Sequence, residues 1–194
     1  MAGRRHTPLA PGRIMMSDLA RIADWRGAID GLPENAAVIL RDYDAPSRDT
    51  LAQQMAAHCH QRGVAFLVAG DARLAQRLGA GFHCPSYLIT RRPQFLASGF
   101  STAAVHNLRQ MVQAAQMGFG TVLLSPAFET VSHPDAPAWG AVRFSGLARA
   151  GQQMGLRVFA LGGIDDARWR RLKEAHDTLS GFAAISYFRP ANGL

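Results

Sequence analysis

The chain has 194 residues, of which 48% are hydrophobic and 18% charged, and its mean hydropathy is -0.03. This balance excludes intrinsic disorder and fibrous repeats and fits one domain with a sizeable core. Lysine and arginine number 21 against 14 acidic residues, so the net charge of +7 favours anionic ligands. The basic residues are scattered and no RNA-binding aromatic signature accompanies them, which argues against nucleic acid.

Short apolar segments of strand length alternate with helical patterns along the chain, as in parallel βα units. A flexible N-terminal tail is expected over residues 1–12 and one domain over 13–190. The expected strands cover residues 13–16, 37–41, 64–69, 81–84, 101–105, 121–125, 157–161 and 182–186. Eight such strands with right-handed crossovers close on themselves, so we predict an α/β fold, a single (β/α)8 TIM barrel. An open doubly wound sheet is the alternative.

The clearest helical pattern follows the second expected strand. Leu51, Met55 and Cys59 recur every four residues and predict an amphipathic helix. Ser47 is placed to cap its start, and Gly63 suits a left-handed stop.

Two further helices are expected after the fifth and seventh strands. The first covers residues 107–117 and ends at Gly118. Its apolar face is predicted to contain Leu108, Met111, Val112 and Ala115. In the second, Asp165 is a plausible N-cap, and Trp169 and Leu172 occupy the inner face.

The sequence predicts a cytoplasmic protein. No apolar stretch of about 18 residues could span a bilayer, and no apolar signal-peptide segment follows the N-terminus. The two cysteines, Cys59 and Cys84, lack the C-x-x-C spacing of a zinc or redox site, and we interpret them as free thiols that pack in the core.

A phosphate site is predicted where the last two strands end. Gly162 and Gly163 stand between a buried strand and a helix start, so backbone N–H groups can approach an anion without obstruction by a Cβ atom. In barrels the common phosphate site is formed after strands seven and eight, which adds Ile185 and Ser186.

The long loop from residue 126 to 139 supplies further donors. It follows the sixth strand and therefore lies at the catalytic face of a barrel. Thr130, Ser132 and His133 can all donate to phosphate oxygens. The alternative is a polar turn stiffened by prolines.

Three more residues at strand ends can carry chemistry. Arg41 offers a planar fork for phosphate, or a salt bridge to a loop acid. His106 can act as a general acid or base, or serve a structural role. Asp71 could help to hold Mg²⁺, although a helix N-cap needs no metal.

Six short motifs occur in the order found in a known superfamily. They are Val38–Arg41, Gly79–His83, His106–Leu108 with Gly118, Ser125–His133, Leu161–Ile164 and Ile185–Ser186. Together they resemble the thiamine-phosphate synthase and thiazole tautomerase (TenI-like) superfamily, from about residue 13 to residue 188. The resemblance implies a small barrel enzyme of thiamine biosynthesis, and it is compatible with a homo-oligomer.

The resemblance implies a thiazole phosphate held at Gly162, Gly163, Ile185 and Ser186, and a Mg²⁺-dependent reaction with a pyrimidine pyrophosphate. Arg41 would neutralise the leaving pyrophosphate, and Thr130, Ser132 and His133 would contact the substrate from the loop. A divergent thiamine-phosphate synthase is therefore the first expectation for function.

Departures from the synthase pattern fall on the pyrophosphate and metal side. Ile39, Tyr43 and Leu88 stand where the family has polar ligands, and Asp71 keeps its metal role only if one residue is deleted in the alignment. Two alternatives follow. One is a TenI-like tautomerase, because His106 falls at the tautomerase's catalytic histidine; the other is a non-catalytic barrel that binds thiazole phosphate or thiamine phosphate.

Overall fold

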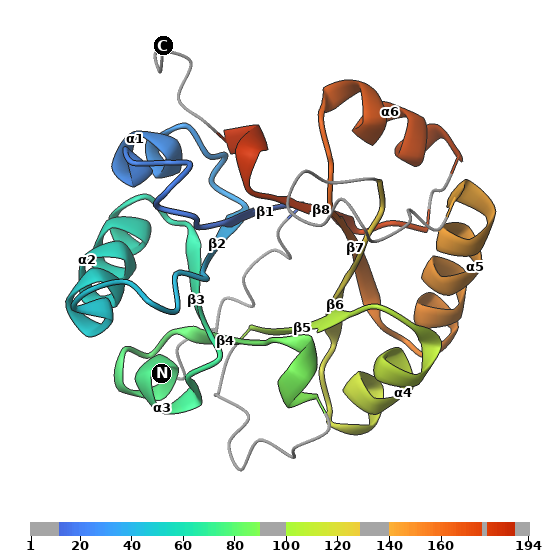
Figure 1. The fold of residues 1–194 in the computed structure, drawn as a ribbon, viewed down its shortest axis with the longest axis horizontal. Coiled ribbons are helices and arrows are strands. Elements are labelled where there is room, and N and C mark those ends of the chain that lie inside the picture. The colour runs from blue at the N-terminus through green and yellow to red at the C-terminus, as the bar shows by residue number, and fades with distance from the viewer. Residues whose placement is uncertain (1–11, 90–99, 129–139, 176–177, 189–194) are drawn as a thin grey trace, which may run out of the picture.

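Eight parallel strands form a closed barrel in chain order, and β8 completes the ring by pairing with β1 (Figure 1). The computed structural model describes residues 12–89, 100–128, 140–175 and 178–188. The strands are β1 (Arg13–Met16), β2 (Ala36–Leu40), β3 (Ala65–Ala69), β4 (Gly81–Cys84), β5 (Ser101–Val105), β6 (Thr121–Leu124), β7 (Arg157–Leu161) and β8 (Gly181–Ala184). The predicted (β/α)8 barrel is confirmed, and the open sheet is excluded.

Strand boundaries differ from the predictions by one or two residues at four strands. The largest difference is in β8, which ends at Ala184, where its pairing with β1 also ends. Ile185 and Ser186, predicted to end the strand, therefore lie in the turn beyond it. This places their backbone at the rim of the barrel.

Helices surround the barrel on its outer side (Figure 1). They are α1 (Trp25–Asp30), α2 (Arg48–Gln61), α3 (Ala72–Arg77), α4 (Leu108–Gln116), α5 (Gly140–Gln153) and α6 (Asp166–Ala175). Two 3₁₀ turns, η1 (Ser86–Leu88) and η2 (Ser186–Phe188), directly follow β4 and β8. Within the described ranges, none of these helices has the length and apolar character needed to cross a membrane.

The predicted amphipathic helix is α2, and its inner face is as expected. Met55 and Cys59 are fully buried, and Gly63 after the helix has a left-handed φ of 66°. Ser47 occupies the N-cap position, but its hydroxyl makes no capping hydrogen bond and its own φ is 53°. The predicted side-chain cap is therefore wrong, because the left-handed backbone turns the residue away from a capping geometry.

In α4 the buried face is rotated from the predicted one. Met111 and Ala114 are fully buried, whereas Leu108 is 46% exposed. Asn107 caps the helix by accepting a hydrogen bond from the N–H of Gln110 at 2.9 Å. Leu108 is consequently the first residue of the helix, at the rim of the barrel, where packing partners are fewer.

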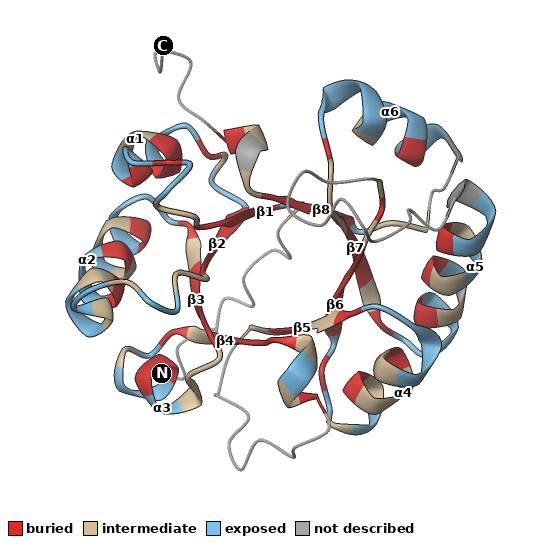
Figure 2. Ribbon diagram, viewed as in Figure 1, coloured by how far each residue is buried: buried red, intermediate tan, exposed pale blue. Residues whose placement is uncertain are grey.

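The core has two layers, one inside the barrel and one between the strands and the helices (Figure 2). The interior layer consists of Ile14, Met16, Ala37, Ile39, Leu67, Ala69, Leu123, Phe159 and Ala183. Side chains alternate along each strand, so the remaining apolar residues face the helices. Burial on both sides of the strands explains their nearly continuous apolar sequences.

An aromatic group covers the outer face of β8. Phe182 is fully buried, with ring centroids 4.9 Å from Trp169 of α6 and 4.8 Å from Tyr187 of η2. Phe188 stacks on the same ring at 6.0 Å. Among the residues described after β8 there is no α-helix, and these side chains cover the strand where an outer helix would otherwise pack.

Candidate functional site

The carboxyl ends of the strands form the rim of the barrel, and most of the predicted site residues lie there. Arg41 directly follows β2 and continues the inward series of Ala37 and Ile39. One guanidinium nitrogen, Nη2, lies 3.3 Å from Asp18, the loop acid that pairs with it. The side chain is 34% exposed, so Arg41 is anchored at the rim without being buried.

A serine and a carboxylate fix the backbone beneath Arg41. The N–H of Arg41 donates to Oγ of Ser17 at 2.8 Å, and the hydroxyl of Ser17 donates to Asp42. Asp42 also accepts from the N–H of Leu19 at 2.7 Å. Ser17 is 1% exposed. The ends of β1 and β2 are thus joined by a buried polar network that orients the strand end carrying Arg41.

Arg48 is a rim residue that the sequence reasoning missed. Its guanidinium donates to the carbonyl of Asp42 at 3.0 Å and to that of Ala69 at 2.8 Å. It also lies over the ring of Tyr43, 5.6 Å from the centroid. In the sequence, Arg48 is simply an arginine at the start of a helix. Its contacts with two strand ends arise only from the tertiary fold.

His83 lies in the barrel interior on β4 and is 2% exposed. Its Nδ1 lies 2.8 Å from Oγ1 of Thr102 on the adjacent strand β5. Burial, assisted by the positive charge of Arg41, lowers the pKa of His83 to about 4. The imidazole is therefore neutral near pH 7, and Arg41 is close enough to influence it.

His106 stands between β5 and α4 and is solvent-exposed. Its Nδ1 lies 3.1 Å from both the carbonyl oxygen and the hydroxyl of Ser125, at the end of β6. The carbonyl accepts a hydrogen bond from Nδ1 when that nitrogen carries the proton, and the hydroxyl can donate to Nδ1 when it does not. Ser125 therefore orients the ring in either tautomer.

The two glycines predicted to bind phosphate directly follow β7 and have positive φ values. Gly162 and Gly163 have φ values of 105° and 63°. Their carbonyl groups are engaged, by the N–H of Phe128 at 3.2 Å and by Arg168 at 2.8 Å, respectively. Their N–H groups have no hydrogen-bond acceptor among the described residues. These N–H groups lie at the end of β7, next to the strand β8 that leads into the turn containing Ile185 and Ser186.

The predicted loop donors Thr130, Ser132 and His133 lie outside the described residues. Of the other predicted ligands, Ile185 follows β8 and is half-buried against the core, and Ser186 begins η2. The structure thus brings the β7 and β8 elements of the predicted phosphate site to adjacent strand ends.

Asp71 is the predicted Mg²⁺ ligand among the described residues. Asp71 caps α3, with Oδ1 accepting from the N–H of Leu74 at 2.9 Å. No group of three His, Cys, Asp or Glu side chains in the described ranges is arranged to hold a metal ion. Mg²⁺ in proteins usually takes one or two carboxylates together with substrate phosphates, and the capping bond of Asp71 uses only Oδ1 of its carboxylate.

Two of the three departures from the synthase pattern are absorbed by packing. Ile39 is fully buried inside the barrel, and Leu88 packs against the core. Tyr43, in contrast, is 42% exposed at the rim. Cys59 and Cys84 are free and buried, as predicted, and burial raises their thiol pKa values to about 12 and about 11.

Comparison with known families decides the relationship. The profile of a family described as thiamine monophosphate synthase matches residues 26–188. The chain belongs to this family. The match extends from α1 to η2 and includes all the described rim residues from Arg41 onward.

Two curated relatives agree with this assignment to the thiamine monophosphate synthase family. "Thiamine-phosphate synthase" of Thiobacillus denitrificans (strain ATCC 25259 / T1) is 31% identical over 157 residues, covering 77% of this chain and 74% of the relative. "Putative thiamine-phosphate synthase 2" of Aquifex aeolicus (strain VF5) is 33% identical over 105 residues, covering 54% of this chain. That match spans about half of the Aquifex protein, 51%.

Solved structures show the same fold at low sequence identity. Thiamine phosphate pyrophosphorylase from Pyrococcus furiosus superposes with a TM-score of 0.71 at 18% identity, covering 96% of this chain and 90% of that one. FabK from Thermotoga maritima gives a TM-score of 0.70 at 14% identity, covering 92% and 58%. At these identities the likeness concerns the barrel architecture alone.

Proposed function

We propose that this family member is a transferase of the thiamine-phosphate synthase type. It binds a phosphorylated thiazole at the rim of the barrel and joins it to a pyrimidine pyrophosphate. The observation that supports this proposal best is the pair of left-handed glycines after β7, whose N–H groups have no acceptor among the described residues. The thiazole phosphate binds there, on Gly162 and Gly163 together with Ile185 and Ser186.

The reaction needs positive charge beside the second substrate. The bond between the pyrimidine methylene carbon and the pyrophosphate oxygen breaks, and its electron pair leaves with pyrophosphate. The lone pair of the thiazole nitrogen then forms the new bond to that carbon. Arg41 is the cation that stabilises the leaving charge, since Asp18 anchors it at the rim. Thr130, Ser132 and His133 are proposed as further donors from the loop.

The test compares two glycine substitutions. Gly163→Ala puts a side chain into the proposed cradle at positive φ, and Gly155→Ala does so after α5, where a Cβ atom meets nothing within 4 Å. We expect Gly163→Ala to weaken binding of thiazole phosphate by about tenfold or more, as loss of a charge-assisted hydrogen bond does. Gly155→Ala should bind as the wild type does.

Calorimetric titration with thiazole phosphate measures these affinities, and formation of thiamine phosphate from both substrates measures the reaction. If Gly163→Ala bound thiazole phosphate with wild-type affinity, the phosphate would have to bind elsewhere. Binding without any thiamine phosphate formed would leave the tautomerase and the non-catalytic binding barrel as the alternatives.

His106 supports a second candidate, a TenI-like thiazole tautomerase. Ser125 holds its Nδ1, so Nε2 is the ring nitrogen proposed to exchange a proton with a thiazole bound at the rim. Isomerisation of thiazole carboxylate phosphate by the wild type, and its loss in His106→Asn, would favour this activity over the transferase. Equal rates in the two proteins would remove His106 from the chemistry.

A further inference from the structure

We infer that Arg168 is a positioning residue of the proposed phosphate site, because its bond to the carbonyl of Gly163 directs the N–H of Ile164 toward the anion as a third donor. This inference rests on the proposed binding of thiazole phosphate at the glycine turn after β7. It goes further by assigning to that turn a donor and a positioning side chain that the sequence did not predict. The class of ligand is a phosphate monoester.

Three consecutive peptide units at the end of β7 have their carbonyl oxygens held by hydrogen bonds. Backbone N–H groups that follow β6 donate to the first two, and a side chain of α6 donates to the third. The bonds are Ala127 N–H to Leu161 at 2.8 Å, Phe128 N–H to Gly162 at 3.2 Å and Arg168 Nη1 to Gly163 at 2.8 Å. Only the third donor is a side chain, so a substitution can remove that bond alone.

These carbonyl bonds decide where the N–H groups of the turn point. In a planar trans peptide unit the N–H points opposite to the C=O. The guanidinium of Arg168 lies over the ring of Phe128, 5.3 Å from its centroid, so the donors share one side of the turn. The N–H groups of Gly162, Gly163 and Ile164 therefore point away from that side, and none has an acceptor among the described residues. Successive N–H groups of this kind form an anion-binding concavity.

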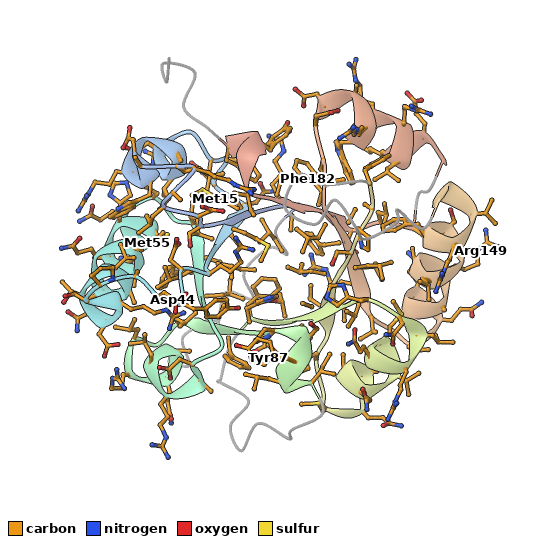
Figure 3. The ribbon with its side chains drawn as sticks, in the orientation of Figure 1. Met15, Asp44, Met55, Tyr87, Arg149 and Phe182 are labelled. Carbon is orange, nitrogen blue, oxygen red and sulfur yellow. The ribbon has the colours of Figure 1, made fainter. Side chains whose placement is uncertain are left out.

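Arg168 is itself held in place. Asp165 accepts from the N–H of Arg168 at 2.8 Å, and its carboxylate lies 3.6 Å from Nε of the guanidinium. The next residue, Trp169, packs against Phe182 beside β8, with 4.9 Å between the ring centroids (Figure 3). The helix α6 therefore presents Arg168 to the glycine turn from a fixed position.

The charge of Arg168 is largely offset where it stands. Asp165 carries the opposite charge beside it, and 44% of the Arg168 side chain is exposed to solvent that screens it. Arg168 consequently acts through the hydrogen bond to Gly163, and not by direct attraction of the phosphate. This distinguishes a positioning residue from a phosphate ligand.

The experiment compares Arg168→Met with Arg168→Lys in the full chain, by calorimetric titration with thiazole phosphate and with inorganic phosphate. Methionine offers no donor, so both ligands should bind about tenfold more weakly, because one of the three donors loses its orientation. Lysine can still donate to the carbonyl of Gly163 and should restore both affinities to within about threefold of the wild type. Arg171→Met is the matched control, since it removes the same charge from an exposed position of the same helix, and it should bind as the wild type does.

Two further measurements separate positioning from charge. The loss in Arg168→Met should remain near tenfold in about 0.5 M salt, since salt screens a charge effect but leaves a hydrogen bond in place. In NMR spectra, inorganic phosphate should move the amide proton of Ile164 downfield in the wild type and by less in Arg168→Met. A loss that disappears in salt, or an Ile164 amide that phosphate does not move in the wild type, would overturn the inference.

This inference and the proposed function fail in different ways. Wild-type affinity of Arg168→Met for thiazole phosphate would overturn the role of Arg168 and leave the transferase standing. Phosphate binding that moves the Ile164 amide and depends on Arg168, with no thiamine phosphate formed from both substrates, would overturn the transferase and leave the inference standing.

Discussion

At the scale of single residues, the strand ends are the places where polar side chains adjoin the apolar interior of the barrel. Arg41 and His106 lie at the rim because a charged or titratable residue that directly follows an apolar strand is not tolerated in the core. Arg48, Ser17 and the contact between His83 and Thr102 were not predictable, since each joins segments far apart in the sequence. Sequence spacing locates a strand end, but it does not show which distant residue will contact that strand end.

The buried imidazole of His83 makes stability depend on pH. Its folded pKa of about 4 lies below the ordinary value of 6.5, so the unfolded chain takes up a proton first as the pH falls. The stabilisation is complete above about pH 6.5 and is lost progressively toward pH 4, with a slope of up to about 1.4 kcal/mol per pH unit.

Urea unfolding of wild type and His83→Gln at several pH values between 4 and 7, on the order of one unit apart, measures this dependence. The wild type should lose more stability than the variant on acidification, because only the wild type carries this imidazole. Parallel curves for the two proteins would contradict the assignment. An NMR titration of the His83 ring, which should not gain a proton near pH 6, gives an independent answer.

At the scale of secondary-structure elements, capping explains helices that periodicity alone locates only roughly. The apolar spacing found α2 and α4, yet it placed Leu108 on the wrong face and gave Ser47 a capping bond that its backbone conformation forbids. Cap geometry depends on the φ and ψ of the preceding loop, which the loop's own contacts determine. The cap of α6 was predictable, because Asp165 accepts from the N–H of Arg168 at 2.8 Å.

Asp71 offers a test of a cap against a metal ligand. Asp71→Ala should lower the free energy of unfolding by about 1 kcal/mol, because the N–H of Leu74 loses its acceptor. Asp71→Asn should lower the free energy of unfolding by only a few tenths of a kcal/mol, roughly, since the amide oxygen can still accept the hydrogen bond. Chemical denaturation of both variants without added metal measures the difference, and equal losses would show that the charge and not the cap is what matters.

At the scale of the whole molecule, eight apolar segments alternating with helical patterns predicted parallel strands covered on both sides, and their number favoured a closed barrel over an open doubly wound sheet. What could not be predicted is how the seam at β8 is covered. Trp169 and the aromatic residues of η2 are separated in the sequence and meet only on the outer face of the closed barrel.

This aromatic cover should contribute strongly to stability. Phe182→Ala removes a fully buried ring that contacts three others and should cost about 3–5 kcal/mol. Tyr187→Phe, which removes only the hydroxyl that donates to Asp166 at 2.6 Å, should cost about 1 kcal/mol or less. Urea unfolding measures both; a small loss for Phe182→Ala would mean that other residues hold the seam.

The two 3₁₀ turns occupy equivalent positions in the two halves of the barrel. The barrel divides into two halves of four strands. Each half ends in a 3₁₀ turn that begins with Ser-Tyr, Ser86–Leu88 after β4 and Ser186–Phe188 after β8. In each half the preceding strand is followed by glycine with positive φ, Gly70 after β3 and Gly162 and Gly163 after β7, and then by an aspartate that caps the next helix. This approximate two-fold symmetry places the turn after β3 and the glycines after β7 on opposite sides of the barrel axis. In the proposed function, two substrates bound at these opposite strand ends would approach each other over the centre of the barrel, as a bond between them requires.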